Sequence, residues 1–281
     1  MNSSFIGKSV ESFVNFLFMH FRSWFDAFSA GLGAVIHLFE ISIAAIPFYV
    51  MLVAIVGLAV WRKGVFFAIF AGLALGSIQY MGLWNQTVST LSLVVAATFF
   101  SLVVGIPLGI WGARNKRVEV VLRSALDFMQ TMPAFVYLIP AVILFGLGKV
   151  PAVIATIVFA MPPVVRLTTL GIKQVREELV EAGRSFGSTD LQLLWNIQLP
   201  NALPSIMAGV NQTIMMALSM VVVASMIGAG GLGEYVISGI QRLDIGIGFE
   251  GGLGVVLLAI ILDRITESFG VKSKKKKKVK A

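Results

Sequence analysis

Glu181-Ala-Gly-Arg-Ser-Phe-Gly187, followed by Ile197-Gln-Leu-Pro200, is the stretch on which the prediction of the fold depends. It lies in a polar segment, residues 173–204, between two long apolar runs. Apolar residues recur through its first half at steps of three and four, a spacing that places one apolar stripe on one helix face. The residues of this predicted stripe are Ile172, Val175, Leu179, Ala182 and Phe186.

The second half of the segment carries the signals of a turn and a new helix. Gly187 favours the end of the first helix, and Ser188, Thr189 or Asp190 can cap a second, short one. Pro200 is expected to break that second helix, because proline donates no backbone hydrogen bond. The sequence therefore predicts a helix, a turn and a helix that lie on a membrane surface and present a face to another molecule.

The spacing of this segment resembles the EAA loop of ABC-transporter permeases. That pattern is Glu-Ala-Ala, three residues, Gly, nine residues, Ile, one residue and Leu-Pro, and Gly183 stands in place of its second alanine. The resemblance implies that the segment docks into a groove on a separate cytoplasmic ATPase; the alternative is a surface helix that packs only on its own protein. The implied coupling residues are Glu181, Ala182, Gly183, Arg184, Gly187, Ile197, Leu199 and Pro200.

Composition indicates an integral membrane protein. The chain has 281 residues, of which 57% are hydrophobic and only 13% are charged, whereas a soluble domain carries about 25% charged residues. The formal net charge is +8, but the lysines after residue 271 supply most of it, and the rest of the chain is close to neutral. The basic balance therefore belongs to a tail, and no nucleic acid is expected as a partner.

Residues that could carry out chemistry are scarce. The chain has no cysteine, and its two histidines, His20 and His37, lie near the N-terminus. No phosphate-binding Gly-Lys-Ser/Thr motif occurs, and the glycine-dense stretch at 228–254 follows no predicted strand. We therefore expect that the chain is not an enzyme and binds no cofactor or metal, and the resemblance to ABC-transporter permeases implies a transport subunit with ATP and Mg²⁺ on partner ATPase subunits.

Seven apolar runs are long enough to cross a membrane, which takes about 20 residues. They are predicted at 41–61, 64–82, 87–111, 129–148, 150–172, 205–229 and 251–269. An aromatic, amphipathic helix before them is expected to lie in the membrane interface. Prolines within 129–172 are expected to kink or interrupt the helices there.

Lysine and arginine occur in every second loop, which sets the predicted orientation. This pattern places the N-terminus outside, the Glu181 segment in the cytoplasm and the C-terminus inside. The predicted organisation has four parts: an interfacial segment at 1–40, two transmembrane helices at 41–84, a permease core at 85–269 and a polybasic, disordered tail at 270–281. The permease core contains the coupling loop at 173–204. The tail is expected to contact anionic lipids.

Charged residues within the spans are few and lie near their ends. Asp263, Arg264 and Glu267 are expected to pair with one another, and Arg166 is explained by pairing or snorkelling. No acid lies at the middle of a span, whereas ion-coupled carriers use such acids as ion sites. The sequence therefore favours an external energy source. The glycines of 228–254 are expected to permit close packing of helices or to form a moving gate.

A wider resemblance covers residues 85–268. Leu126-Asp-Phe-Met-Gln-Thr-Met-Pro-Ala-Phe-Val-Tyr-Leu-Ile-Pro140, Gly228-Ala-Gly-Gly-Leu-Gly233 and Ile260-Ile-Leu-Asp-Arg-Ile-Thr266 are similar to the glycine betaine and proline betaine branch of these permeases. This resemblance implies the type I ABC importer fold in a bacterial inner membrane. It also implies a homodimer of permeases, two ATPase subunits and an external substrate-binding protein that delivers quaternary-ammonium osmoprotectants.

Three alternatives remain open from the sequence. One is an ABC permease for another small solute, such as an amino acid. Another, of a different class, is a secondary transporter or channel, which predicts ion-coupled flux and inverted repeats. The third is a membrane scaffold that does not transport and whose Glu181 segment binds some other partner.

Overall fold

The computed structural model describes residues 5–270, with side chains described at 12, 16 and from 19 onward. Within these residues the chain is helical throughout, and the only other regular element is one π-helical turn. The predicted all-α class is confirmed. Apart from Gly270, the predicted polybasic tail at 270–281 lies outside the described residues.

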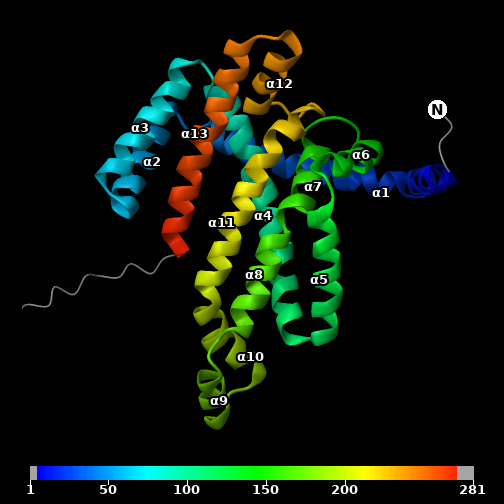
Figure 1. Ribbon diagram of the computed structural model, residues 1–281, viewed down its shortest axis with the longest axis vertical. Coiled ribbons are helices and arrows are strands. Elements are labelled where there is room, and N and C mark those ends of the chain that lie inside the picture. The colour runs from blue at the N-terminus through cyan, green and yellow to red at the C-terminus, as the bar shows by residue number, and fades with distance from the viewer. Residues whose placement is uncertain (1–4, 271–281) are drawn as a thin grey trace, which may run out of the picture.

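Helix α1 (Phe5–Ala44) is kinked at Phe21 and runs across the long axis of the bundle (Figure 1). Its part Met19–Ala44 is 26 residues long and apolar enough to cross a membrane. Two predicted boundaries are therefore wrong. The segment ending at residue 40 continues to Ala44, and the span predicted from residue 41 starts inside α1, because the chain breaks only at the turn before Pro47.

Helices α2 (Phe48–Lys63) and α3 (Val65–Tyr80) form a hairpin that packs on α13. Gly64 makes the turn between them with a φ of 97°, a conformation that glycine adopts at no steric cost. Each helix has 16 residues and is thus about 24 Å long, which is shorter than an apolar bilayer core of about 30 Å. The hairpin replaces the longer spans predicted at 41–61 and 64–82.

The core of the bundle is built on α4 (Trp84–Arg114) and α11 (Leu199–Ser225), which contact each other and α7 and α8. Helices α7 (Lys149–Ala160) and α8 (Pro162–Lys173) together form one span of 25 residues. Glycines let α4 and α8 approach closely: a Cβ at Gly109 would lie 2.6 Å from Thr168 Cβ and 2.8 Å from the Val165 carbonyl oxygen. The contact therefore depends on the missing side chain.

The span predicted at 129–148 is wrong, because the chain bends sharply within it. Helix α5 (Lys116–Thr131) ends just before Met132, and α6 (Ala134–Phe145) starts after Pro133, with an angle of 98° between them. Met132 has a ψ of 136°, the extended conformation that a following proline imposes. Pro133 also donates no hydrogen bond back into α5.

The helix lengths give five candidate membrane spans, or six if the bent pair α5 and α6 is one span. The predicted count of seven differs because the two hairpin helices are short and the aromatic N-terminal helix is long. The five spans are Met19–Ala44, Trp84–Arg114, Lys149–Lys173, Asp190–Ser225 and Ile245–Gly270.

The glycine-dense stretch packs backbone against backbone, as predicted. It includes α12 (Leu232–Arg242) and the start of α13 (Ile245–Gly270), and at their crossing a Cβ at Gly239 would overlap the Gly248 backbone. The Leu232 amide donates a buried hydrogen bond of 2.8 Å to Thr90 Oγ1 on α4. These contacts hold the end of the molecule opposite to the Glu181 segment (Figure 1).

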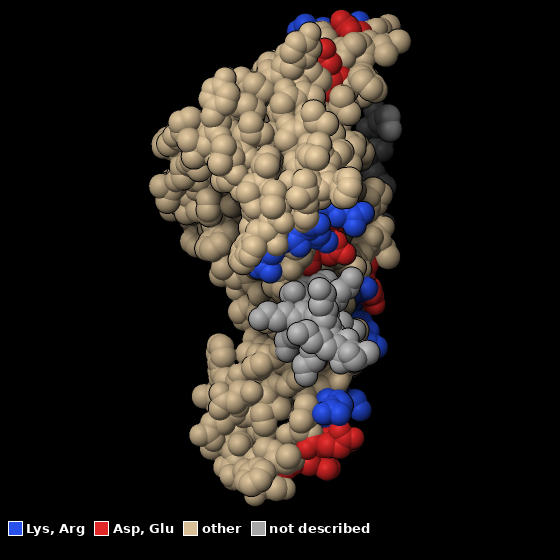
Figure 2. Space-filling view, turned by 90° about the vertical axis from the view of Figure 1, so that its left-hand side faces the viewer, with Lys and Arg blue, Asp and Glu red and all other residues tan. Residues whose placement is uncertain are grey.

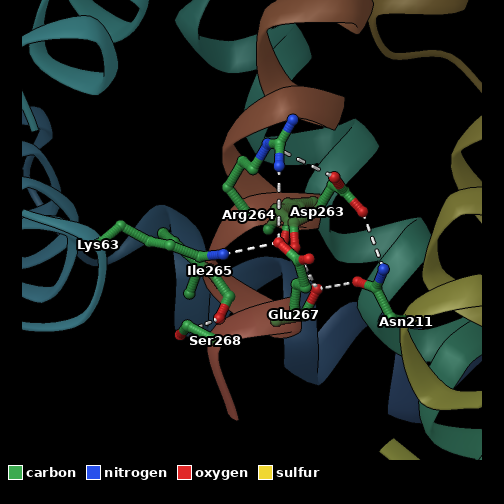
Figure 3. A network of polar contacts seen from close by, with 9 residues as sticks. Lys63, Asn211, Asp263, Arg264, Ile265, Glu267 and Ser268 are labelled. Atoms are coloured by element: carbon green, nitrogen blue, oxygen red, sulfur yellow. Dashed lines mark hydrogen bonds and ion pairs between the residues drawn. The ribbon is translucent and has the colours of Figure 1, made fainter. Parts of the chain in front are cut away.

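A polar network joins the end of α13 to its two neighbours (Figure 3). Lys63 of α2 reaches Glu267 at 2.6 Å from one side, and Asn211 of α11 donates to Asp263 at 2.8 Å from the other. Arg264 contacts Glu267 at 3.6 Å, which confirms the pairing predicted within this helix. Lys63 ends α2 and the three charged residues of α13 lie in its last turns, whereas Asn211 is an uncharged residue at the middle of α11.

Charged side chains gather in separate zones along the long axis of the molecule. On the face in Figure 2 they gather at the top edge, in a band at mid-height and at the lower end, and the broad surface above the band carries none. The α2–α3 hairpin lies on this side and exposes large apolar side chains, among them Tyr49, Val53, Phe66, Ile69 and Leu73. An uncharged belt of exposed apolar residues fits the lipid layer of a membrane.

Candidate functional site

The Glu181 segment forms one end of the long axis of the molecule (Figure 1). It consists of α9 (Glu177–Ser185), α10 (Asp190–Leu193) and the π-helical turn Leu194–Gln198, which leads directly into α11. The predicted helix, turn and helix are confirmed. We call this end, residues 173–200, the coupling tip.

The predicted stripe from Ile172 to Phe186 is not continuous, which corrects the sequence analysis. Helix α8 ends at Lys173, and α9 starts only after Arg176, whose ψ of 131° interrupts the helical hydrogen bonding. As a result Ile172 is buried in the core, whereas Phe186 is 91% exposed at the tip. The apolar residues are spaced as in one helix, but they belong to two separate helices, α8 and α9.

Gly187 ends α9 in the way its position predicted. Its φ is 79°, its amide donates to the Arg184 carbonyl oxygen at 2.9 Å, and the Ser188 amide donates to the Gly183 carbonyl oxygen at 3.0 Å. This is a Schellman motif, which satisfies the last carbonyl groups of the helix and reverses the chain. The turn therefore fixes the direction in which the chain passes from α9 to α10.

Replacing Gly187 with alanine should strain this turn, because a left-handed φ costs a non-glycine residue about 1–2 kcal/mol. Space is not the problem, since no other atom lies within 4 Å of a Cβ there. We expect ATP-driven uptake to fall several-fold at unchanged membrane levels. Gly57→Ala is the matched control, because the surroundings of Gly57 are equally open and its backbone is helical. Equal uptake by both variants would show that the left-handed turn at Gly187 is not needed for coupling.

Thr189 caps the second helix with a capping box. Its hydroxyl accepts from the Gln192 amide at 3.3 Å, and the Gln192 side chain accepts from the Thr189 amide at 2.8 Å. Two backbone donors that have no partner inside the helix are thereby satisfied. Of the three candidate caps in the sequence, Thr189 is the one used.

Pro200 does not break the helix, contrary to prediction. It lies in the first turn of α11, where its missing donor is tolerated, and the preceding π turn widens the backbone so that the Leu199 amide donates to the Leu194 carbonyl oxygen. Asn201 Nδ2 donates to the Ile197 carbonyl oxygen at 2.7 Å. The coupling tip is thus continuous with the 27-residue helix α11.

Gly183 joins the two halves of the predicted motif. It is buried, and a Cβ on it would lie 2.5 Å from Ile197 Cδ1 and 2.6 Å from Leu193 Cδ2. Leu199 is half-buried and packs in a cluster with Ile172 and other residues of the bundle. The predicted residues Gly183, Ile197 and Leu199 therefore hold α9 on the base of α11.

The remaining predicted residues face outward. Glu181, Ala182, Arg184, Gly187 and Pro200 are exposed, and neither Glu181 nor Arg184 has an ion pair among the described residues. They are available to a partner molecule, and a charged pair on a protein surface sets the orientation of a partner more than its affinity.

Sequence reasoning missed the apolar part of this surface. Beside Phe186, Leu191 is 60% and Trp195 is 62% exposed at the coupling tip. Large aromatic residues exposed among charges are typical of protein interfaces. The signal in the sequence was a tryptophan inside the polar segment at 173–204. Among residues 5–270, no group of acids or histidines is placed to hold a metal ion.

Comparison with known proteins decides the family. Residues 105–272 match the model of the family described as "Binding-protein-dependent transport system inner membrane component". The chain belongs to this family. The coupling tip, the end of α4 and the helices from α5 onward lie inside the matched range, so this permease is a multi-pass component of a bacterial membrane transport system.

Relatives match this permease over almost its full length. It is 48% identical over 257 residues to the glycine betaine/proline betaine transport system permease protein ProW of Escherichia coli (strain K12), covering 92% of this chain and 73% of ProW. It is 44% identical to the glycine betaine transport system permease protein OpuAB of Bacillus subtilis (strain 168), covering 94% of both chains. The Listeria monocytogenes glycine betaine/carnitine transport permease protein GbuB is 46% identical over 97% of this chain and 96% of its own.

Solved structures confirm the fold of this permease. An inward-facing MetNI methionine ABC transporter superposes with a TM-score of 0.58 at 22% identity, over 65% of this chain and 91% of that one. An amino acid ABC transporter solved with histidines gives a TM-score of 0.51 at 20% identity, over 70% and 94%. The predicted resemblance to the ABC-importer permeases is therefore confirmed at the level of family and fold.

Proposed function

We propose that this chain is the membrane-spanning subunit of an ATP-driven importer of glycine betaine or related quaternary-ammonium osmoprotectants. The observation that carries this proposal is the match, at 44–48% identity and over nearly the whole chain, to permeases named for these solutes. Identity of this degree extends beyond the coupling motif to nearly all of the helices. ATP hydrolysis belongs to a separate subunit in this proposal.

The assembly that fits this function is a homodimer with two cytoplasmic ATPase subunits and an external substrate-binding protein. The coupling tip supports the docking part of the proposal: Glu181, Ala182 and Arg184 are exposed beside Phe186 and Trp195 at one end of the molecule. When ATP brings the two ATPases together, α9 moves with them. Because the tip is continuous with α11, this motion turns the membrane helices and opens the path outward.

The orientation follows from the same assembly. The coupling tip faces the cytoplasm, and α12 at the opposite end faces outward (Figure 1). We propose that the aromatic part of α1 lies along the membrane interface, because the helix runs across the bundle and leaves Phe16, Trp24 and Phe28 exposed. The α2–α3 hairpin enters the membrane beside α13, and the lysine tail follows on the cytoplasmic side near anionic lipids.

The solute chemistry is divided between subunits. A quaternary ammonium is recognised by aromatic faces through cation–π attraction, and such a cage belongs to the binding protein that captures the solute. The permease needs only a path that does not retain the cargo. A small amino acid is the second candidate solute, since the solved structures of this fold include amino acid transporters, but their 22% or lower identity supports the fold alone.

Uptake measurements test this function directly. The permease, reconstituted in proteoliposomes with its ATPase and binding protein, is expected to accumulate radiolabelled glycine betaine only when ATP is present inside the vesicles. Unlabelled proline betaine, carnitine and choline are expected to compete more strongly than amino acids. ATP-independent uptake driven by an ion gradient, or competition by amino acids alone, would contradict the proposal.

A further inference from the structure

A cleft of about 280 Å³ lies between α5 and α8, next to the coupling tip. Its walls carry two carboxylates and three cations. The charged residues of α5 recur every four residues and those of α8 are seven residues apart, so on each helix they lie on one face. The five residues are Glu119, Arg123 and Asp127 on α5, and Arg166 and Lys173 on α8.

The charges form two groups along the cleft. Arg166 pairs with Asp127 in one group, and both Lys173 and Arg123 pair with Glu119 in the other. Eight residues separate Asp127 from Glu119 along α5, which corresponds to about 12 Å. Each group presents a carboxylate beside a cation, and apolar side chains such as Leu126 and Val165 line the wall between them.

One donor in this cleft has no acceptor. The Arg166 Nε atom is buried and makes no hydrogen bond among the described residues, although the same guanidinium binds Asp127 through Nη2. Buried polar atoms are nearly always hydrogen-bonded in native proteins. The atom is buried as the side chain stands, so the carboxylate of a ligand can accept from both Nε and Nη only when the Asp127 pair opens and the guanidinium turns into the cleft.

The mixture of charges selects the class of ligand. A phosphate or another anion would meet Glu119 and Asp127 as well as the cations, and a simple cation would meet Arg123, Arg166 and Lys173. A zwitterion satisfies both signs at once. A quaternary ammonium has no hydrogen to donate, so it needs a nearby carboxylate and apolar walls, and this cleft has both.

We propose that the α5–α8 cleft is an inward-side binding site for a small zwitterion with a quaternary ammonium and a carboxylate. Arg166 holds the carboxylate, and the ammonium lies beside Asp127 on the apolar wall. This inference rests on the proposed function and adds a site within the permease. Lys173 is the last residue of α8 and α9 starts at Glu177, so the site lies directly against the element that meets the ATPase.

We expect this site to bind its ligand weakly, which suits a solute that must be released. The ligand competes with ion pairs that are already formed, and it binds only as those pairs open. A zwitterionic lipid headgroup has the same chemistry as a free betaine. The experiment therefore has to separate the two sources.

Direct binding of radiolabelled glycine betaine is measured on the permease with its ATPase, in phosphatidylglycerol nanodiscs without binding protein. Wild type is expected to bind saturably. The double variant Asp127→Asn/Arg166→Gln should bind at least tenfold more weakly, and Arg166→Lys should lie between, because it keeps the charge and loses the Nε donor. The control is Glu40→Gln/Lys149→Gln, which removes an inter-helix ion pair of 2.5 Å at the opposite end of the span Lys149–Lys173, outside the lining of the cleft, and should bind like wild type.

The outcomes separate the site from the function. Unchanged binding by the Asp127/Arg166 variants, with the same thermal unfolding as wild type, overturns the site even if uptake of glycine betaine proceeds. Absence of saturable betaine binding, together with bound phosphatidylcholine after reconstitution in that lipid, assigns the cleft to a headgroup and also overturns it. Failure of the wild-type complex to take up betaine at all contradicts the proposed function itself.

Discussion

Replacing Gly183 with leucine is expected to reduce ATP-driven uptake strongly while the protein still inserts and folds. Gly183 is buried between α9 and the π turn, and even a Cβ would lie 2.5 Å from Ile197 Cδ1. A leucine therefore forces α9 away from the base of α11, at a cost of about 1–3 kcal/mol for overpacking. Since 1.4 kcal/mol corresponds to a factor of ten, uptake should fall by about tenfold or more.

Gly183→Ala is the matched control for this experiment. The atoms that a single methyl group would meet are Ile197 Cδ1 and Leu193 Cδ2, the ends of flexible side chains, and they can move by rotation. The alanine variant should transport like wild type, whereas the leucine variant should retain ATP hydrolysis that no longer drives uptake. Normal uptake by Gly183→Leu would show that α9 does not carry the coupling.

Replacing Gly109 with leucine should prevent the core from packing and remove the protein from the membrane. The obstacle is the backbone: a Cβ on Gly109 would lie 2.8 Å from the Val165 carbonyl oxygen, as well as 2.6 Å from Thr168 Cβ. Unlike the ends of side chains, a buried backbone cannot move aside without separating α4 from α8. We expect a loss of about 3 kcal/mol or more, the upper end of the cost of overpacking.

The measurement is thermal unfolding in detergent together with the amount of protein in isolated membranes. Gly57→Leu is the control, because no other atom lies within 4 Å of a Cβ at Gly57 and the residue is exposed on α2. It should accumulate and unfold like wild type. If Gly109→Leu had the same melting temperature, the close approach of α4 and α8 would not be needed for the fold.

Local signals in the sequence predicted local structure well. Gly187 ends a helix because glycine accepts a left-handed φ, and Thr189 begins the next because its hydroxyl satisfies the free amides; both effects act within four residues. The fixed spacing of the coupling motif likewise identified the family. The expected break at Pro200 is wrong, because a π turn accommodates this proline. The expected interruption by the prolines within 129–172 is confirmed at Pro133, where the chain bends by 98°, although the apolar run around it wrongly predicted a single span.

The candidate site could be predicted only in part for a related reason. Its position along the chain was clear, but periodicity does not reveal that α8 and α9 point in different directions, which buries Ile172 and exposes Phe186. The same limit applies to Asp127 and Arg166, 39 residues apart along the chain, whose pairing depends on how α5 returns beside α8.

Apolar composition determined by itself that this protein is a helical membrane protein, and the spacing from Glu181 to Pro200 carried the resemblance to the family that the comparison confirmed. These properties depend on the burial of apolar residues in lipid and on short-range backbone geometry, both of which are encoded residue by residue. Docking of the Glu181 segment on a partner stays a prediction. Tertiary structure alone decided that Gly183 packs beneath Ile197, and that charges from α5 and α8 share one cleft. Contacts between distant segments result from the packing of whole helices, and no local pattern records them.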